Sequence, residues 1–332
     1  MAYDLNHIAC VGSSLVTSMI LGFICVKSNL YPWKKIPMLN KYNFQSFLFV
    51  LLFKFPAYKT FSGYNMYPFI ILSISHVIMH LLFSIMFLFP SINGGQIFIS
   101  TLMPATYVNY ITIGIPIFRA LWGKDNLIFV SMMILCNETI IAPMYFLEAG
   151  LFNHYLINKF HDSNHEPRES IKSTFFTGIL WNIFTSPINL SMITGLIFSV
   201  VGKGVPTYFA RIVKIGADGV LCVTLFCIGG FVASHNILIR NWKRFIFSIL
   251  LKFFIFPMIN GLMAWLFHLE SAICRCCLLM TTLPCVFLCY FMAENNGDGS
   301  ETATQMIFWT MILFLPVLFA WILLLDYLKI FV

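Results

Sequence analysis

Apolar segments long enough to cross a lipid bilayer recur along almost the whole chain. A membrane-crossing helix needs about 20 apolar residues, and runs of roughly that length are separated here by short polar connections. The predicted spans are 7–26, 43–58, 66–89, 96–122, 127–147, 175–201, 212–233, 245–267, 272–293 and 304–328. The pattern therefore predicts an all-α, polytopic membrane protein of about ten transmembrane helices.

The composition excludes the main soluble classes. Of the 332 residues, 59% are hydrophobic and only 10% are charged, whereas a soluble domain is about 25% charged. The net charge of +7 comes from lysines and arginines scattered through the connections, so the expected partner is the lipid bilayer and not a nucleic acid. The ten cysteines form no pair of CxxC motifs, and we interpret them as packing residues without a metal or cofactor.

The polar stretch 153–172 divides the predicted spans into five and five. We expect a first five-helix repeat at 1–150, a short cytoplasmic central loop at 151–174 and a second five-helix repeat at 175–332. An odd number of spans per half makes the two repeats inverted, which is typical of secondary transporters. Connections on the side of the central loop carry ten lysines and arginines against seven on the other side, so both termini are predicted to be non-cytoplasmic.

Two predicted spans contain residues that interrupt a helix. The fourth span has Asn109 followed by Gly114 and Pro116, and the ninth has Pro284. In lipid such breaks survive where they face protein or a water-filled cavity, although a simple proline kink is the alternative. If both segments unwind, two half-helix N-termini meet and favour a carboxylate. The candidate substrate-binding residues are Asn109, Tyr110, Thr112, Pro116, Pro284 and Cys285.

Ionisable residues inside spans are candidates for ion coupling or structural support. His76 and His80 lie four residues apart, on one helix face, and could couple transport to protons or be neutral, hydrogen-bonded histidines. Asp218 could pair with Lys214, and Glu138 is the most plausible partner for the lone cation Lys252. The candidate coupling and support residues are His76, His80, Glu138, Asp218 and Lys252.

Five motifs in order along the chain resemble those of one transporter family, the auxin efflux carriers (PIN-like) and bacterial organic-anion permeases. They are Asn109 with Gly114 and Pro116, Pro187 with Gly195, Asp218 with Phe226 and Gly229, Lys252 with Pro257, and Leu283-Pro284 with Ala293-Glu294. The resemblance implies two inverted five-helix repeats, with broken helices four and nine crossing at a substrate site. It also implies a scaffold that often mediates homodimers, and transport of small organic anions.

The expected function is therefore a secondary transporter, and not an enzyme, that moves auxin-like or other carboxylates by alternating access. An intramembrane protease is disfavoured because Asp218 is the one Asp expected to be buried in a span. The alternative is a transport-inactive sensor or interaction module that binds a lipid or sterol in the same cavity. We expect no separate signalling domain, which favours the carrier. The plasma membrane and an endomembrane are equally compatible with the sequence.

Overall fold

The computed structural model describes residues 3–43, 52–53, 65–84, 94–123, 126–163, 173–201, 207–239, 241–295 and 299–331. Nearly all of these residues are helical. The first half contains α1 (Leu5–Lys27), η1 (Trp33–Lys35), α2 (Ile36–Asn43), α4 (Tyr67–Ser84), α5 (Gly94–Thr106), η5 (Tyr110–Gly114), α6 (Ile115–Trp122), α7 (Ile128–Cys136), η6 (Asn137–Ile141) and α8 (Ala142–Ser163). The second half contains α9 (Ser173–Thr185), α10 (Pro187–Val201), α11 (Thr207–Ser234), α12 (Trp242–Leu250), η7 (Leu251–Ile255), α13 (Phe256–Leu266), α14 (Ser271–Thr281), α15 (Leu288–Asn295) and α16 (Ser300–Tyr327).

Three of the short segments, η5, η6 and η7, are π-helical turns inside longer helical stretches. A π-turn adds one residue to a helix and leaves part of the i to i−4 bonding unmade, and such turns occur frequently at functional sites. In η7, the indole nitrogen of Trp321 donates to the carbonyl oxygen of Phe253 over 2.8 Å. A side chain from α16 thus satisfies a carbonyl in one of these turns.

Helices α1 and α11 pack against each other along most of their length, and α2 lies against α11. The contact depends on two glycines, because a Cβ atom at Gly22 would collide with the backbone oxygen of Phe226, and one at Gly229 with that of Met19. Small residues of this kind let membrane helices approach backbone to backbone. The Asn43 amide attaches α2 by donating to the backbone oxygen of Val220 in α11, at 3.1 Å.

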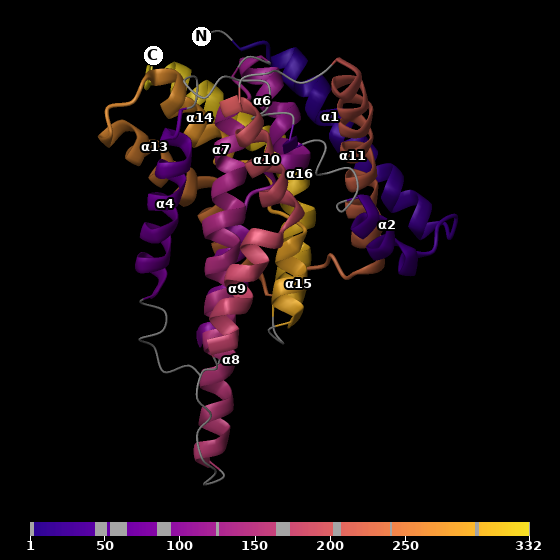
Figure 1. The fold of residues 1–332 in the computed structure, drawn as a ribbon, viewed down its shortest axis with the longest axis vertical. Helices are drawn as coiled ribbons and strands as arrows, with labels where there is room; N and C mark the ends of the chain where they lie inside the picture. The colour runs from indigo at the N-terminus through magenta and orange to yellow at the C-terminus, as the bar shows by residue number, and fades with distance from the viewer. Residues whose placement is uncertain are drawn as a thin grey trace.

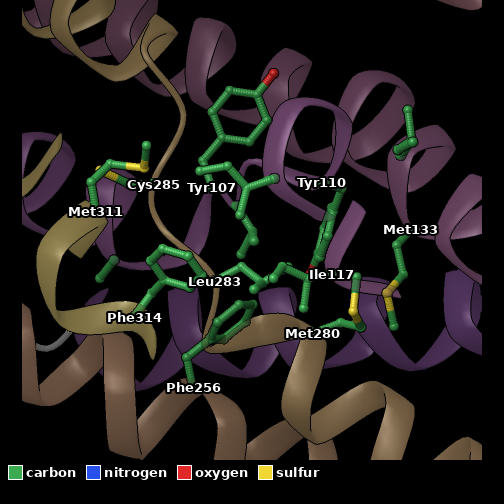
Figure 2. Packing of buried hydrophobic residues seen from close by; sticks show 14 of the residues in the cluster. Tyr107, Tyr110, Ile117, Met133, Phe256, Met280, Leu283, Cys285, Met311 and Phe314 are labelled. Atoms are coloured by element: carbon green, nitrogen blue, oxygen red, sulfur yellow. The ribbon is translucent and has the colours of Figure 1, made fainter. Parts of the chain in front are cut away.

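The remaining core is a larger group of helices built from α4 to α8 and α12 to α16. At its centre, apolar side chains from both halves of the chain surround the segments that link α5 to η5 and α14 to α15 (Figure 2). Tyr110, Phe256, Leu283 and Phe314 are each no more than 1% exposed there. This packing fixes where the two linking segments lie.

Several of the helices have the length and apolar character of membrane spans. Within the described residues, four stretches are long and apolar enough to cross a bilayer, and a fifth arises if the pair bent by 54° at Pro187 is one span. These stretches are Leu5–Lys27, Ile128–Phe152, Trp242–Leu266 and Ser300–Tyr327, with Phe176–Thr185 plus Pro187–Val201 as the bent pair. Shorter apolar helices lie in four other predicted spans, namely Tyr67–Phe83, Tyr110–Trp122, Gly219–Ser234 and Ser271–Thr281. Most of the predicted span 43–58 lies outside the described residues.

The predicted central loop at 151–174 begins as helix, because α8 continues to Ser163. Polar residues can extend a helix beyond the lipid since water solvates their side chains, and no proline follows Pro143 before Pro167. Helix α8 accordingly projects beyond the other helices at one end of the molecule (Figure 1). Residues 164–172 lie outside the described part of the chain.

Both ends of the chain lie together at the opposite end of the molecule (Figure 1). Arg275, which is 3% exposed, connects them. Its guanidinium group lies 5.9 Å from the ring centre of Tyr3, pairs with Asp326 over 2.6 Å and donates to the backbone oxygen of Phe331 over 2.9 Å. An even number of membrane crossings would leave the ends on one side in this way.

Candidate functional site

The two interrupted segments meet and pair through their backbones. Val108 and Cys285 form an antiparallel bridge. On either side of it, the Asn109 N–H donates to the oxygen of Pro284 over 2.9 Å, and the Val286 N–H donates to the oxygen of Tyr107 over 3.1 Å. Unwound backbone in a membrane protein needs partners inside the protein. Each interruption here supplies partners for the other.

We call the place where the two interrupted segments, residues 107–109 and 282–287, pair with each other the crossing. Side chains from neighbouring helices satisfy further backbone groups there. The Asn137 amide in η6 donates to the oxygen of Val108 over 2.7 Å. The hydroxyl of Thr310 in α16 accepts the N–H of Cys285 over 3.3 Å. The crossing is thus held from both sides as well as by its own pairing.

Asn109 occupies the N-cap position of the half-helix that begins with η5. Its side-chain oxygen accepts the N–H of Thr112 over 3.0 Å, which is the usual role of an asparagine cap. The oxygen is therefore used within the helix, and the Nδ2 amino group is the part of this side chain that can donate to a ligand. The sequence prediction of a break beside Asn109 is confirmed.

Pro116 does not make this break, in contrast to the expectation that included it in the interruption. It lies in α6, directly after the π-helical turn η5 and inside the continuous helical stretch 110–122. The chain unwinds at residues 107–109 instead. Pro284, by contrast, lies inside the second interruption, between the end of α14 and the start of α15.

A cavity of about 810 Å³ lies against the crossing. Its walls come from α2, the crossing, η6 and the start of α8, α9 and α10, α11, and the segment 286–288. The cavity is large enough for a small organic ligand, since ligand pockets have volumes of about 300–1,000 Å³. Of the predicted site residues, Asn109, Tyr110, Thr112 and Glu138 line it, whereas Pro116, Pro284 and Cys285 do not.

The cavity is mainly apolar with few polar groups. Among the described residues that line it, the charged side chains are Lys41, which is exposed, and Glu138. The Glu138 carboxylate accepts the hydroxyl of Tyr107 over 3.0 Å. The partner of Glu138 in the structure is thus Tyr107, and the expected ion pair with Lys252 is not formed, because the Lys252 amino nitrogen has no hydrogen-bond partner among the described residues.

Lys252 lies in η7 and is fully buried. Its amino nitrogen has no hydrogen-bond partner within the part of the chain that the structure describes. Its neighbourhood includes His76 of α4 and Cys285 in the second interruption. A buried ammonium group without a partner destabilises a protein. We therefore expect Lys252 to have a functional role and not a stabilising one.

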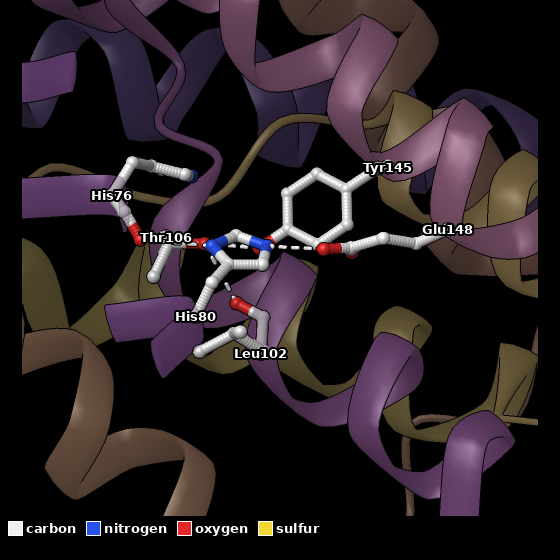
Figure 3. Close-up of polar contacts among 6 residues, drawn as sticks. All are labelled: His76, His80, Leu102, Thr106, Tyr145 and Glu148. Carbon is white, nitrogen blue, oxygen red and sulfur yellow. Dashed lines mark hydrogen bonds and ion pairs between the residues drawn. The ribbon is translucent and has the colours of Figure 1, made fainter. Parts of the chain in front are cut away.

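The predicted histidine pair forms a second polar cluster (Figure 3). Its residues are not among those that line the cavity. The rings of His76 and His80 lie 5.4 Å apart, and His80 Nδ1 lies 2.8 Å from the backbone oxygen of His76. His80 Nε2 lies 3.2 Å from the carboxylate of Glu148 in α8. Beside them, the hydroxyls of Tyr145 and Thr106 are 2.6 Å apart. The cluster therefore joins α4, α5 and α8.

Several residues of these two sites were not expected from the sequence. Glu148 lies just beyond the end predicted for the fifth span, so it was not counted as a membrane carboxylate. Asn137 and Asn189 were missed because they are uncharged and only ionisable residues were selected inside the spans. The signal that could have identified them is a polar amide within an apolar run.

Asp218 lies in α11, but its side chain is outside the described residues, as is that of Lys214.

Comparison with known proteins agrees with this architecture. The family described as "Membrane transport protein" matches residues 13–322. The chain belongs to this family. It is also 22% identical to a protein named "Auxin efflux carrier component 8" from Arabidopsis thaliana, over 97% of this chain and 98% of that protein. The resemblance to auxin efflux carriers stated from the motifs is thereby confirmed, and the chain is a membrane transport protein with membrane-spanning helices.

Proposed function

We propose that this protein is a secondary transporter that moves a small organic carboxylate across a membrane by alternating access. The observation that carries the proposal is the pairing of the two interrupted segments at Val108 and Cys285 beside a ligand-sized cavity. In secondary transporters the substrate site lies where discontinuous helices meet near the middle of the membrane. The name of the Arabidopsis relative supports an auxin-like carboxylate as one substrate to test.

The carboxylate group of the substrate is placed at the crossing. The N-terminus of a helix favours an anion because its N–H groups and its dipole point toward it, and the half-helix capped by Asn109 begins at the cavity. Tyr110 and Thr112 complete that wall of the cavity. Pro284 and Cys285 act on the substrate indirectly, by holding the second interruption in place.

Glu138 lies in the same cavity, so its carboxylate and that of the substrate would repel each other if both were ionised. Proton uptake by Glu138 would remove the repulsion and couple anion binding to a proton. The buried residues His76, His80 and Lys252 do not line the cavity and are proposed to support this proton transfer, with Asp218 as a further candidate in α11.

The proposed architecture has ten transmembrane helices in two inverted repeats, 1–150 and 175–332, joined by a cytoplasmic segment. The position of both chain ends at one end of the molecule supports an even number of spans (Figure 1). The antiparallel pairing of the interruptions supports an inverted relation between the halves. Both termini are then non-cytoplasmic, and we propose that two chains associate as a homodimer.

Flux measurements in proteoliposomes test the proposal. Asn109→Ala removes the cap and the free amino group at the crossing, so uptake of radiolabelled indole-3-acetate or benzoate should fall at least tenfold, with the protein still folded. Asn236→Ala is the matched control, because Asn236 is exposed and also accepts a backbone N–H, that of Leu238. Ligand binding without any flux in the wild-type protein would instead favour a sensor that does not transport.

A further inference from the structure

The connection between the first two predicted spans is strongly basic. Residues 27–43 contain four lysines and no acidic residue. All four side chains are exposed, and none of them forms an ion pair within the part of the chain that the structure describes. These residues are Lys27, Lys34, Lys35 and Lys41. Their positive charge is therefore available to a partner outside the protein.

Large apolar side chains of the same connection are exposed as well. Leu30 is 77% exposed, Trp33 is 50% exposed, and Met38 and Tyr42 are each 59% exposed. Tryptophan and tyrosine are enriched at membrane surfaces, where the ring meets apolar chains and the polar group meets the headgroups. A segment that joins two spans lies at such a surface. Lysines interleaved with exposed apolar side chains are typical of a segment that binds in the membrane interface.

The connection is held in place by side chains that face α11. The ring centres of Tyr31 and Phe226 are 5.9 Å apart. The Asn43 amide donates to the hydroxyl of Thr224 over 2.8 Å, and Ile36 is only 2% exposed. A segment that is already ordered loses less conformational freedom when it binds a partner. The outward side chains of this connection are thus presented by a fixed backbone.

Helix α2 has the cavity on one face and an exposed surface on another. Pro37, Asn40 and Lys41 have the spacing of one helix face, and they line the cavity. Met38 and Tyr42 are four residues apart on a different face and are exposed. Figure 1 shows α2 at the outer edge of the molecule, beside α11. A partner that binds outside α2 therefore acts on a helix that forms part of the cavity wall.

We propose that Lys34 and Lys35, with Trp33 beside them, bind the headgroup of an anionic phospholipid. The oxygens of the headgroup accept hydrogen bonds from the two ammonium groups, and the acyl chains lie against the exposed apolar side chains of the connection. Anionic lipids are concentrated in the cytoplasmic leaflet. The connection lies on the side of the membrane that the proposed orientation makes cytoplasmic.

The bound lipid holds α2 in place and thereby keeps the cavity wall formed by Pro37, Asn40 and Lys41 in position. Uptake of the carboxylate is accordingly faster in a membrane that contains anionic lipid. This effect on transport rests on the proposed function. Binding of the lipid itself does not, so the two are measured separately.

Fluorescence quenching by brominated lipids measures the binding. The full chain is reconstituted in vesicles of phosphatidylcholine that contain either dibrominated phosphatidylserine or the same fraction of dibrominated phosphatidylcholine. The chain has seven tryptophans, so the signal of Trp33 is the difference between the wild type and Trp33→Phe. Dibrominated phosphatidylserine should quench Trp33 more strongly than dibrominated phosphatidylcholine does.

Variants of the two lysines test their part in this preference. Each lysine near an anionic surface strengthens the attraction about fivefold. The double variant Lys34→Gln and Lys35→Gln should therefore need about fivefold more phosphatidylserine, or more, for the same quenching. Arginine at both positions keeps the charge and should keep the preference. Lys329→Gln is the control, because Lys329 is also exposed but lies near the other end of the chain.

Uptake of radiolabelled indole-3-acetate tests the consequence for transport. Vesicles of phosphatidylcholine alone are compared with vesicles that contain about one quarter phosphatidylserine, a cytoplasmic anionic lipid. The wild type and Lys329→Gln should be faster with phosphatidylserine. The double glutamine variant should match the wild type in phosphatidylcholine alone and lose the stimulation.

The outcomes separate this inference from the proposed function. Equal quenching of Trp33 by the two lipids overturns the lipid site, and so does the absence of quenching, as expected if a second copy of the chain covers the connection. A preference that persists in the double glutamine variant overturns the assignment to Lys34 and Lys35. Lipid preference without stimulated uptake overturns the effect on transport. Lipid preference without any uptake in either vesicle overturns the proposed function and leaves the lipid site standing.

Discussion

Val108 and Cys285 pair with each other as the centre of an antiparallel bridge between two interrupted helical segments. The bonds beside this pair make each interruption the partner of the other. A change that loosens one segment therefore exposes polar backbone in both, and lipid cannot solvate it. Residues that hold the crossing should affect stability and transport together.

Thr310 provides a direct test of this link. Its hydroxyl accepts the N–H of Cys285 over 3.3 Å and donates to the oxygen of Met306 over 2.6 Å. Thr310→Val keeps the shape but leaves the N–H of Cys285 without an acceptor, which should cost about 1–3 kcal/mol. We expect a lower thermal unfolding temperature in detergent and reduced uptake in proteoliposomes. Thr310→Ser keeps the hydroxyl and should be close to the wild type; equal loss in both variants would contradict the hydrogen-bond argument.

The contact between α1 and α11 should not tolerate an added methyl group. Gly22→Ala and Gly229→Ala each place a Cβ atom against backbone of the other helix, so we expect a loss of about 1–3 kcal/mol or more from overpacking. Gly219→Ala lies in the same helix α11 with no atom within 4 Å. It should be neutral or stabilising, by up to about 1 kcal/mol from helix propensity. Thermal unfolding of the three variants checks the sign, and a stabilising Gly229→Ala would contradict the close approach.

Removal of the buried charge at Lys252 should stabilise the protein and impair its function. The side chain is fully buried and its nitrogen has no hydrogen-bond partner in the described part of the chain. Lys252→Met preserves most of the volume without the charge, and we expect a gain of about 1–4 kcal/mol together with a large loss of flux. Lys243→Met changes an exposed lysine in the neighbouring helix α12 and serves as control. A destabilised Lys252→Met would show that the charge has a structural partner.

The contact between His80 and Glu148 should affect proton coupling more than substrate binding. The two side chains are 3.2 Å apart and only His80 is deeply buried, with side-chain exposures of 7% and 24%. Glu148→Gln and His80→Gln should remove most of the stimulation of uptake by an inward proton gradient, with the dissociation constant for the carboxylate little changed. His7→Gln replaces an exposed histidine and should have no effect. Unchanged stimulation in both variants would exclude this pair from the coupling.

The sequence predicted those features that depend on local signals. Apolar runs predicted helices, and the polar and proline residues inside two of those runs predicted the breaks that meet at Asn109 and Pro284. Asn109, Tyr110 and Thr112 were expected together because they follow one another around the first break, and they line one cavity. Glu138 was expected among the coupling and support residues, and it lines the same cavity. The role of Pro116 was misplaced, since the chain unwinds at residues 107–109 and Pro116 lies inside the helical stretch that follows.

Partners distant in the sequence could not be predicted in the same way. The bond from Tyr107 to Glu138, and those from Asn137 to Val108 and from Thr310 to Cys285, depend on how separate helices pack. A single sequence contains no direct signal for such pairs. Glu148 was missed for a different reason, because the predicted end of the fifth span lay one residue too early to include it.

The wide turns η5, η6 and η7 have a mechanical consequence for the helices that contain them. Each turn holds one residue more than an α-helical turn, so a shift of the turn by one position rotates the intervening residue by about 100° relative to the rest of the helix. Such a shift exchanges backbone hydrogen bonds one at a time. In the helices around the crossing, movement of a π-turn by one residue would therefore turn a side chain into or out of the cavity wall without unfolding the segment.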